Sequence, residues 1–363
     1  MEIQELNKQI RKESTERIKA KVPEQVSTSW YNEDLLYSGK GKSIFVILAT
    51  EGCSWALGPS GGCTMCSYIN DCTQKPVKSN KIIELFKNEL EKHPYKEDFK
   101  SDDKIAIKIF ASGSFLNPKE VPKEARDEIL KILSESEEIS EIVVESRPEY
   151  VKEDVIEEVF NIIEDKLFEI SMGLETSNDK TRLYNINKGF TLKDFENAVN
   201  IIKKMKEKGY NIKSKPYIFL KPILLSEKES INEAIETGIY CNNIGVDRLS
   251  YCPATIHGKT LIERLWRENS YKPPWIWSAV EVINRIRDEV SIPSLMDTSA
   301  FGSRRGPYNC KKCNKDLKHL IIKTNLTQDK IDYDCECKNE WKAEVECGDF
   351  NYSKTKINHL PLY

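Results

Sequence analysis

The sequence predicts an α/β protein whose parallel strands form a partial or full β/α barrel, with a small cysteine-rich module near the C-terminal end. First, short β-branched runs alternate with amphipathic helical patterns through the middle of the chain, as in repeated βα units. Second, a glycine-rich loop with three cysteines follows the first of these runs. A doubly wound sheet, the main alternative, usually has a phosphate-binding glycine turn at that place. Third, two cysteine pairs lie close together after residue 300.

The expected strands are short, as is typical of strands covered by helices on both faces. In chain order they are residues 43–50, 104–111, 141–146, 167–174, 212–220, 246–252 and 292–298. The expected helices are residues 81–92, 123–134, 153–163, 192–208, 228–240, 260–266 and 279–290. Pro118 and Pro122 precede the second helix, and Thr191 is the predicted N-cap of the fourth. Six or seven βα units with right-handed crossovers favour the barrel.

The chain divides into three expected segments: an N-terminal helical extension (1–40), a barrel domain (41–300) and a C-terminal cysteine-rich module (301–363). The first 21 residues alternate charged and amide side chains with sparse Ile and Leu. This pattern predicts an exposed helix and not a signal peptide. No apolar run approaches the roughly 20 residues of a membrane span.

Composition indicates a globular protein with ample core, because 39% of the 363 residues are hydrophobic and 31% are charged. The net charge of −3 gives no overall attraction to nucleic acid, so RNA contact would need local basic patches. We expect neither a membrane nor a DNA partner. The eleven cysteines are an odd number, and the sequence shows no secretion signal. Both observations favour metal ligation in the reducing cytoplasm over disulfides.

Three cysteines, Cys53, Cys63 and Cys66, have the spacing Cys-x9-Cys-x2-Cys. The glycines between them tolerate left-handed dihedrals, so the loop can wrap closely around an inorganic cluster. Three thiolates can hold a 4Fe–4S cube and leave one iron open for a substrate or cofactor. The alternative is a structural zinc site in which Cys72 is the fourth ligand.

Small or charged residues follow several predicted strands, and barrel enzymes place their chemistry at the carboxyl ends of strands. These residues are Ser112, Gly113, Ser114, Glu145, Arg147, Glu175 and Cys252. The alternatives are that Glu175 is a solvated carboxylate, that Arg147 only braces a strand end, and that Cys252 is a buried small hydrophobe.

The C-terminal cysteines Cys310, Cys313, Cys335 and Cys337 flank a hairpin-like stretch, residues 320–324, and resemble a zinc ribbon. The second pair is Cys-x-Cys, tighter than usual, so Cys347 is a possible substitute ligand. An auxiliary iron–sulfur cluster or free thiols are the alternatives to zinc. Basic residues with interleaved aromatics in this region suit phosphate contact and base stacking. The predicted RNA contacts are Arg304, Arg305, Lys311 and Lys312.

Together these motifs resemble the radical S-adenosylmethionine (SAM) enzymes, in the branch that contains the elongator catalytic subunit. Residues 145–149 (ESRPE) resemble its E-x-R-P-[DE] element, and residues 173–176 (GLET) and 187–191 (NKGFT) resemble two further elements. The resemblance covers about residues 43–298. Departures are Met65, where the family usually has an aromatic residue, and Lys188 and Phe190, where it has Arg and His.

This resemblance implies a 4Fe–4S cluster on Cys53, Cys63 and Cys66, with SAM at its open iron. It implies that the turn formed by Ser112, Gly113 and Ser114 holds the methionyl end of SAM. Glu145 would accept hydrogen bonds from the ribose hydroxyls, and Lys188 would meet the SAM carboxylate. The remaining implied SAM contacts are Arg147 and Glu175.

A narrower resemblance is to the archaeosine synthase β subunit family, carried by residues 53–66 and by residues 302–310 (GSRRGPYNC). It implies a tRNA substrate whose 7-cyano-7-deazaguanine is joined to the lysine ε-amine, and radical cleavage of the lysine Cε–N bond. It also implies a complex with the lysine-transferring α subunit. The alternatives are a radical SAM enzyme with another tRNA position or a small molecule as substrate, and a non-catalytic zinc-bearing RNA-binding protein.

Overall fold

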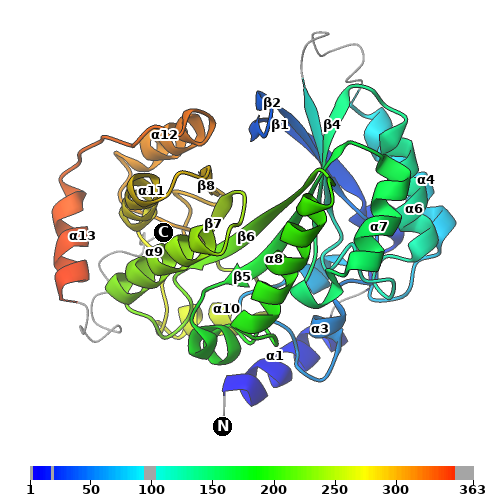
Figure 1. Ribbon diagram of the computed structural model, residues 1–363. Coiled ribbons are helices and arrows are strands. Elements are labelled where there is room, and N and C mark those ends of the chain that lie inside the picture. Colours follow the sequence, from blue (N-terminus) through cyan, green and yellow to red (C-terminus); the bar gives the residue numbers. More distant parts are fainter. Residues whose placement is uncertain (1–2, 18–19, 94–103, 348–363) are drawn as a thin grey trace.

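The computed structural model describes residues 3–17, 20–93 and 104–347, and within them a single eight-stranded sheet curls into a half barrel (Figure 1). The strands lie in the order of the chain, with β1 antiparallel to β2 and all later neighbours parallel. They are β1 (Thr28–Leu36), β2 (Gly39–Ile47), β3 (Ile105–Phe110), β4 (Ile139–Glu145), β5 (Leu167–Glu175), β6 (Ile212–Leu220), β7 (Leu249–Pro253) and β8 (Ser294–Met296). The predicted partial barrel is thus confirmed.

Long helices cover the outer face of the sheet (Figure 1). They are α4 (Ser79–Glu91), α6 (Lys123–Ser134), α7 (Glu153–Ile163), α8 (Leu192–Glu207), α9 (Glu227–Asn243) and α11 (Ile276–Glu289). Alternate residues of a strand face opposite sides of a sheet. In β5, Phe168 and Ile170 pack in the hydrophobic core under the helices, whereas Glu169 faces the inside of the half barrel. The outer face therefore holds the core, and the inner face is polar.

Shorter elements lie mostly at the two ends of the sheet. They are α1 (Ile3–Arg17), α2 (Pro23–Val26), α3 (Ser54–Leu57), η1 (Tyr68–Asp71), η2 (Pro148–Tyr150), the π-helical turn η3 (Thr181–Asn185), α10 (Leu261–Arg267), α12 (Asn314–Thr327) and α13 (Cys337–Glu346). Among them α1, α3 and α10 gather at the carboxyl end of the parallel strands (Figure 1).

Paired charges occupy the inner face near the amino ends of the strands. Lys215 lies 2.6 Å from Glu169, and Arg248 lies 3.4 Å from the other oxygen of the same carboxylate. Burial opposes ionisation of Glu169, but the charges of Lys215 and Arg248 lower its pKa to about 2. Buried charges need such partners, because an unpaired charge in a protein interior is costly.

The N-terminal segment differs from the expected exposed helical extension. Residues 28–36 form β1, an edge strand whose Trp30 ring stacks on Phe45 at 5.1 Å. The sequence did not predict this strand, because most of its side chains are exposed and apolar residues alternate only weakly along it. Moreover, α1 is not simply exposed, since Asn7 and Arg11 are buried against the cysteine loop.

The expected hairpin-like stretch at residues 320–324 is wrong, because it lies in helix α12. Leu317, Ile321 and Thr324 are buried and recur at helical spacing, so this face packs inward. The helix lies against both edge strands, β8 and β1, at the open side of the half barrel. The C-terminal segment is therefore helical in its described part, without the strands of a ribbon.

The C-terminal segment also shares the hydrophobic core of the barrel, to which Cys313, Ile321 and Trp341 belong. The side chain of Asn325 accepts from Met296 N (3.0 Å) and donates to Met296 O (2.8 Å). These bonds pair backbone groups of the edge strand β8 that would otherwise need water or another chain. The division of the chain at residue 300 stays a prediction.

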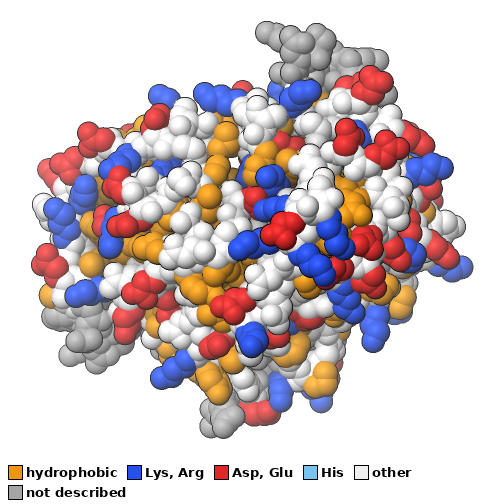
Figure 2. Space-filling model, viewed as in Figure 1, with side chains coloured by type: hydrophobic (Ala, Val, Ile, Leu, Met, Phe, Trp, Pro, Cys, Tyr) orange, Lys and Arg blue, Asp and Glu red, His pale blue; other side chains and the backbone are white. Residues whose placement is uncertain are grey.

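None of the described helices is both long and apolar enough to cross a membrane. The face seen in Figure 2 mixes acidic and basic side chains without a large field of one sign. This pattern agrees with the nearly balanced composition, so attraction of a polyanion would depend on local clusters.

Candidate iron–sulfur and SAM site

The cysteine loop lies at the carboxyl end of the first parallel strand, β2, where barrel enzymes hold their active sites. Cys53 is the N-cap of α3, and Cys53, Cys63 and Cys66 are all half-buried free thiols. Burial, and then the neighbouring Cys63 and Cys53, raise the pKa of Cys66 to about 12. The three thiols therefore lie near one another in poorly solvated surroundings, in which a bound cation would favour the thiolate form.

The loop has the tight backbone that its composition predicts, since Gly52, Gly61 and Gly62 all have positive φ. At Gly62 (φ 75°) an added Cβ would lie 2.9 Å from the Cα of Ala56. An L side chain at Gly62 would therefore be both strained and crowded.

Glu120 ties the cysteine loop to the glycine turn after β3, a role that the sequence analysis missed. Its carboxylate accepts from Ser54 N at 2.9 Å, from Ser114 N and from the Asn117 side chain at 3.0 Å. It is only 3% exposed. Any side chain at Gly113 would collide with this carboxylate, so the close approach requires glycine. The available sequence signal was only an acidic residue six positions after Ser114, and its burial shows only in the structure.

Of the predicted glycine-turn residues, Ser114 is fully buried, and its Oγ accepts from Arg147 N at 3.1 Å. Ser112 has a positive φ of 51°, which is unusual for a residue with a side chain. The turn is thus tied to the end of β4 through Ser114, and it leaves Gly113 beside Cys53.

Arg147 joins three loops at this end of the barrel. Its guanidinium lies over the Trp55 ring (5.0 Å) and the Phe190 ring (5.4 Å), and it donates to Lys188 O at 2.9 Å. Its Nε also pairs with Glu149 at 2.6 Å. These contacts fit the bracing alternative, because each of them goes to protein groups.

Lys188 and Glu175, two predicted SAM contacts, form a buried ion pair of 2.7 Å. Burial opposes the charge on Lys188, but the Glu175 carboxylate raises the pKa of the ammonium, which therefore stays protonated. Glu175 has a positive φ of 68° next to a bulge in β5. Glu175 is thus a buried partner and not a solvated carboxylate.

The residue before this lysine holds the cysteine loop directly, which the sequence analysis did not predict. The Asn187 side chain donates to Gly62 O (2.7 Å) and to Ser60 O (2.9 Å), and its own carbonyl accepts from the Trp55 indole (2.8 Å). The N-K-G-F element therefore contacts the cysteine loop through Asn187, in addition to presenting Lys188.

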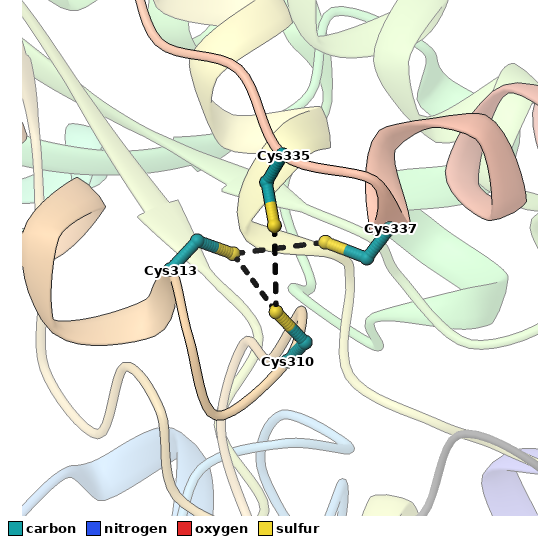
Figure 3. Close-up of side chains that lie close together, drawn as sticks. All are labelled: Cys310, Cys313, Cys335 and Cys337. Carbon is teal, nitrogen blue, oxygen red and sulfur yellow. Dashed lines mark hydrogen bonds between the residues drawn. The ribbon is translucent and has the colours of Figure 1, made fainter.

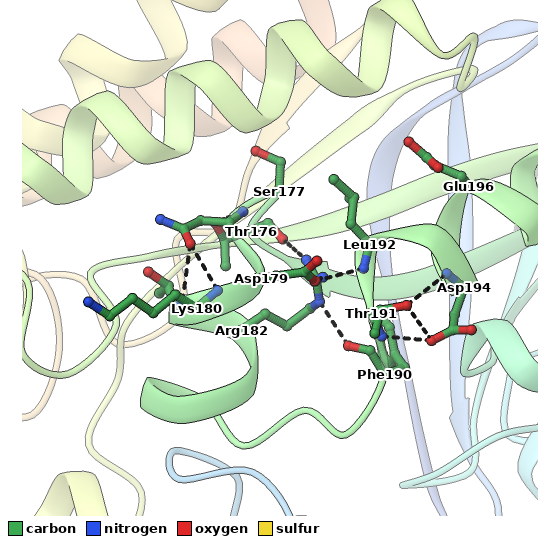
Figure 4. A network of polar contacts seen from close by, with 12 residues as sticks. Thr176, Ser177, Asp179, Lys180, Arg182, Phe190, Thr191, Leu192, Asp194 and Glu196 are labelled. Carbon is green, nitrogen blue, oxygen red and sulfur yellow. Dashed lines mark hydrogen bonds and ion pairs between the residues drawn. The ribbon is translucent and has the colours of Figure 1, made fainter.

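Asn187 and Lys188 belong to the loop between β5 and α8, which the buried side chain of Arg182 holds. Figure 4 shows Arg182 with its partners in this loop. Arg182 is 0% exposed and donates to Thr176 O, to Phe190 O (3.1 Å) and to the Asp179 carboxylate. Asp179 in turn accepts from Leu192 N at the start of α8. These bonds hold together the two ends of the loop between β5 and α8.

Glu145, the predicted ribose acceptor, ends β4 on the inner face. Burial raises the pKa of its carboxyl to about 7, although a hydrogen bond with Tyr217 and the charge of Lys215 oppose the shift. A carboxyl with this pKa changes its charge near neutral pH, unlike an ordinary glutamate.

Helix α1 supports the cysteine loop from outside the barrel, in contrast to its expected exposure. Asn7 donates to Gly62 O at 2.8 Å, while Arg11 donates to Gly61 O at 2.9 Å and to Cys66 O at 2.5 Å. The loop backbone is thus held by side chains that are far away in the sequence, which composition alone does not show.

Cys72 and Cys252 lie outside the group of three. Cys72 is 1% exposed, and its thiol contacts Tyr68 O at 3.2 Å. Among the described residues, Cys53, Cys63, Cys66 and Cys72 are not a set whose sulfurs lie within 4.8 Å of one another. The alternative of a four-cysteine zinc knuckle therefore has no geometric support. Cys252 is half-buried against a second hydrophobic cluster, consistent with a small hydrophobe.

The tail cysteines form a compact group of four (Figure 3). The sulfurs of Cys310, Cys313, Cys335 and Cys337 all lie within 4.8 Å of one another. The individual separations are 3.4 Å, 3.7 Å and 3.6 Å for 310–313, 310–335 and 313–337. The Trp277 indole donates to the Cys337 sulfur at 3.3 Å, as outer groups do for metal-bound thiolates. Cys347 is exposed and outside this group.

The predicted RNA contacts divide into two places. Lys311 and Lys312 are exposed beside the tail cysteines. Arg304 and Arg305 instead lie over the Trp266 ring, at 5.4 Å and 5.0 Å.

Comparisons with known proteins give relatives over nearly the whole chain. The archaeosine synthase subunit beta of Methanosarcina acetivorans is 37% identical over 344 residues, 93% of this chain and 94% of that protein. The protein of the same name from Thermococcus kodakarensis is 37% identical over 330 residues, 88% of this chain and 97% of that protein. An uncharacterized protein of Methanocaldococcus jannaschii is 38% identical over 354 residues, 96% of this chain and 94% of that protein. No family model matches the chain.

Among solved structures, Elp3 of Methanocaldococcus infernus aligns with a TM-score of 0.48 and 16% identity, covering 68% of this chain and 59% of that chain. A radical SAM methyltransferase from Sphaerobacter thermophilus aligns with a TM-score of 0.46 and 11% identity, covering 74% of this chain and 73% of that chain.

A half barrel whose first parallel strand runs into a three-cysteine loop is the arrangement that the resemblance to radical SAM enzymes implies, so the fold and the site agree with that class. Within the class, the relatives of 37% identity span about nine-tenths of the chain or more. The chain therefore belongs to the archaeosine synthase subunit beta family.

Proposed function

We propose that this chain is a cytoplasmic radical SAM enzyme that completes archaeosine in tRNA by cleaving the lysine Cε–N bond of a lysine-modified 7-cyano-7-deazaguanine. The family membership supports the substrate, because the named relatives are archaeosine synthase subunits. The observation that carries the chemistry is the set of three thiols at the carboxyl end of the strands, held by Glu120 and Asn187.

The donor set fits a cubane better than a single ion. At least one pair of the three loop sulfurs lies more than 4.8 Å apart, unlike the tail group. Three sulfur ligands leave one iron open. We therefore assign the cluster to Cys53, Cys63 and Cys66, and SAM to the space beside Gly113, Glu145 and Lys188, with Ser112, Ser114, Arg147 and Glu175 shaping that space.

When bound, the cluster and SAM supply a 5′-deoxyadenosyl radical that abstracts a hydrogen atom from the substrate. In the overall proposed reaction, lysine Cε is oxidised and SAM is the oxidant, so the electrons balance. Conversion of the Cε amine to an aldehyde releases two electrons, and water supplies the aldehyde oxygen. SAM takes up the same two electrons on becoming methionine and 5′-deoxyadenosine. The formamidino base and a lysine-derived semialdehyde are the other products.

The residues of this chain position and shield the reactants. The Glu145 carboxylate would accept hydrogen bonds from the ribose hydroxyls, and the Lys188 ammonium, which is paired with Glu175, would meet the SAM carboxylate. Arg147, Trp55 and Phe190 pack at this end of the barrel and keep solvent away from a reactive radical.

We propose zinc for the tail cysteines, in a structural role, because four thiolates leave no open position. The ion would fix α12 and α13 against the open side of the barrel. The family name also supports a complex with the lysine-transferring α subunit.

The test is an anaerobic assay of the reconstituted protein with dithionite, SAM and lysine-modified tRNA. We expect 5′-deoxyadenosine and archaeosine to form in equal amounts. A colourless protein containing only zinc would contradict the radical chemistry and favour a zinc-bearing RNA-binding protein. Cleavage of SAM without any change in the tRNA would instead indicate that the chain is a radical SAM enzyme that acts on another substrate.

A further inference from the structure

A pocket beside the cysteine loop has basic and aromatic walls. Its volume is about 690 Å³, and its lining residues are Trp266, Arg267, Asn269, Ser303, Arg304 and Arg305. None of these six residues is acidic, so the lining carries three formal positive charges.

The pocket lies at the same end of the barrel as the cysteines. One wall comes from α10, which follows β7, and the other from residues 303–305, which follow β8. Ile262 N, at the start of α10, donates to Thr64 O at 3.2 Å, and Thr64 lies between Cys63 and Cys66. The pocket therefore adjoins the loop that we assign to the cluster.

The arginine side chains are held in place at the pocket wall. Arg304 and Arg305 lie over the Trp266 ring, at 5.4 Å and 5.0 Å. Arg305 and Arg267 share one oxygen of Glu263, at 2.7 Å and 2.9 Å. Glu263 thus orients two of the guanidinium groups and offsets one of their charges, so a net positive charge is held in place before any ligand arrives.

Two residues that line the pocket each have a buried donor without a hydrogen-bond partner among the described residues. These donors are the indole N–H of Trp266 and the hydroxyl of Ser303, whose atoms are both buried. Trp266 is only 8% exposed. Buried donors without partners are rare in folded proteins, and an acceptor that binds beside them would also meet the guanidinium groups of the lining.

We propose that this pocket binds a backbone phosphate of the RNA substrate close to the modified nucleotide. The proposal rests on the proposed tRNA substrate. Phosphate oxygens accept from the Trp266 indole, the Ser303 hydroxyl and the Arg304 guanidinium, whose planar fork suits a phosphate. Anchoring at this place directs the neighbouring nucleotide toward the cysteine end of the barrel.

Three variants remove one donor each: Trp266→Phe, Ser303→Ala and Arg304→Gln. Phenylalanine keeps an aromatic ring under the arginines, although a smaller one, and removes the N–H; neither Trp266→Phe nor Ser303→Ala removes a hydrogen bond within the described chain. Arg264→Gln is the matched control, because Arg264 lies on the same helix but outside the pocket lining.

The measurement is the affinity of the full-length protein for lysine-modified tRNA over a series of salt concentrations. We expect about fivefold or greater weakening for Trp266→Phe, Ser303→Ala and Arg304→Gln, since each loses a bond to a charged acceptor. Arg304→Gln also lowers the slope of log affinity against log salt by about 0.7–0.9, as expected for one lost phosphate contact. Arg264→Gln keeps both values near those of the unmodified chain.

The outcomes separate this proposal from the proposed function. If the unmodified chain converts the tRNA and all three pocket variants bind it normally, the pocket assignment is overturned and the proposed function stands. If inorganic phosphate binds in the pocket but the variants leave tRNA binding unchanged, the site is one for a free anion, which also overturns it. If the unmodified chain cleaves SAM but binds no tRNA, the substrate assignment fails, and this inference fails with it.

Discussion

The two cysteine sites of this chain use the same ligand atoms at different spacings. In the tail, sulfur–sulfur separations of 3.4–3.7 Å come close to the edge of about 3.8 Å of a tetrahedron with Zn–S bonds of about 2.3 Å. In the loop, at least one pair of sulfurs is farther apart than 4.8 Å. The tail therefore fits one ion with a closed ligand shell, whereas the loop sulfurs are spread more widely, as the proposed cluster with an open position requires.

The supports of the two sites differ as well. The tail cysteines lie in or against the main hydrophobic core, and Cys313 is 0% exposed. The loop is instead held by polar side chains from distant segments, among them Arg11, Glu120 and Asn187. We conclude that loss of the tail site should mainly affect stability, and that loss of the loop site should mainly affect chemistry.

The largest expected effect is that of Cys63→Ala, which removes one of three cluster ligands. We expect 5′-deoxyadenosine formation to fall below detection while the tail metal stays at one equivalent, because the two sites share no ligand. The measurements are product analysis by chromatography and metal analysis of the same sample. Cys347→Ala is the control, since Cys347 is exposed and outside both groups. Persistent 5′-deoxyadenosine in Cys63→Ala would show that the ligand assignment is wrong.

Next is Cys313→Ala in the tail, for which we expect the opposite pattern. Metal binding contributes on the order of 10 kcal/mol to the folding of isolated zinc modules, so its loss should destabilise the chain by several kcal/mol. Below its lowered Tm, the variant should still cleave SAM. Thermal unfolding and single-turnover SAM cleavage at low temperature check both parts. An unchanged Tm with full loss of the tail metal would break the comparison, because the tail site would then not be structural.

A smaller effect is expected for Glu120→Gln at the loop. The amide turns one acceptor into a donor that faces Ser54 N or Ser114 N, so a buried donor loses its partner. We expect a loss of about 1–3 kcal/mol in the free energy of unfolding, together with a lower iron content after reconstitution. Glu124→Gln, an exposed change on α6, should stay within about 0.5 kcal/mol of the unmodified chain. Equal stability and equal iron content in the two variants would argue against a supporting role for Glu120.

The smallest expected effect is a pH dependence of SAM affinity. Burial raises the pKa of Glu145 to about 7, in a setting that also contains Tyr217, Lys215, Lys188 and Glu175. Because the ionised carboxylate is the form that accepts from the ribose, affinity should rise with pH. Between pH 6 and 8 the ionised fraction grows about tenfold for this pKa, so affinity should rise by about that factor. Calorimetry on reconstituted protein should show this rise, and Glu145→Gln should flatten it. A SAM affinity that stays constant or falls over this pH range would show that Glu145 is not the ribose acceptor.

Much of the fold could be predicted from local patterns. The predicted bounds of β6, α6 and α7 match the structure, because these elements are strongly periodic and end at clear signals. The edge strand β1 was missed because its exposed side chains carry little period-two signal. Residues 320–324 were misassigned because a short apolar run fits a strand as well as a helix, and only packing against the half barrel decides between them.

The sequence by itself determined the cysteine spacings, the order of the βα units and the placement of small and charged residues after the strands. These features are local, so chain neighbours specify them. The tertiary structure alone decided that Glu120, Asn187 and Arg11 hold the cysteine loop, and that Glu175 is paired with Lys188. It also brought α10 and residues 303–305 together around one basic pocket. Most of these contacts join residues that are far apart in the chain. The curvature of the sheet decides which residues meet, and no local sequence pattern encodes that curvature.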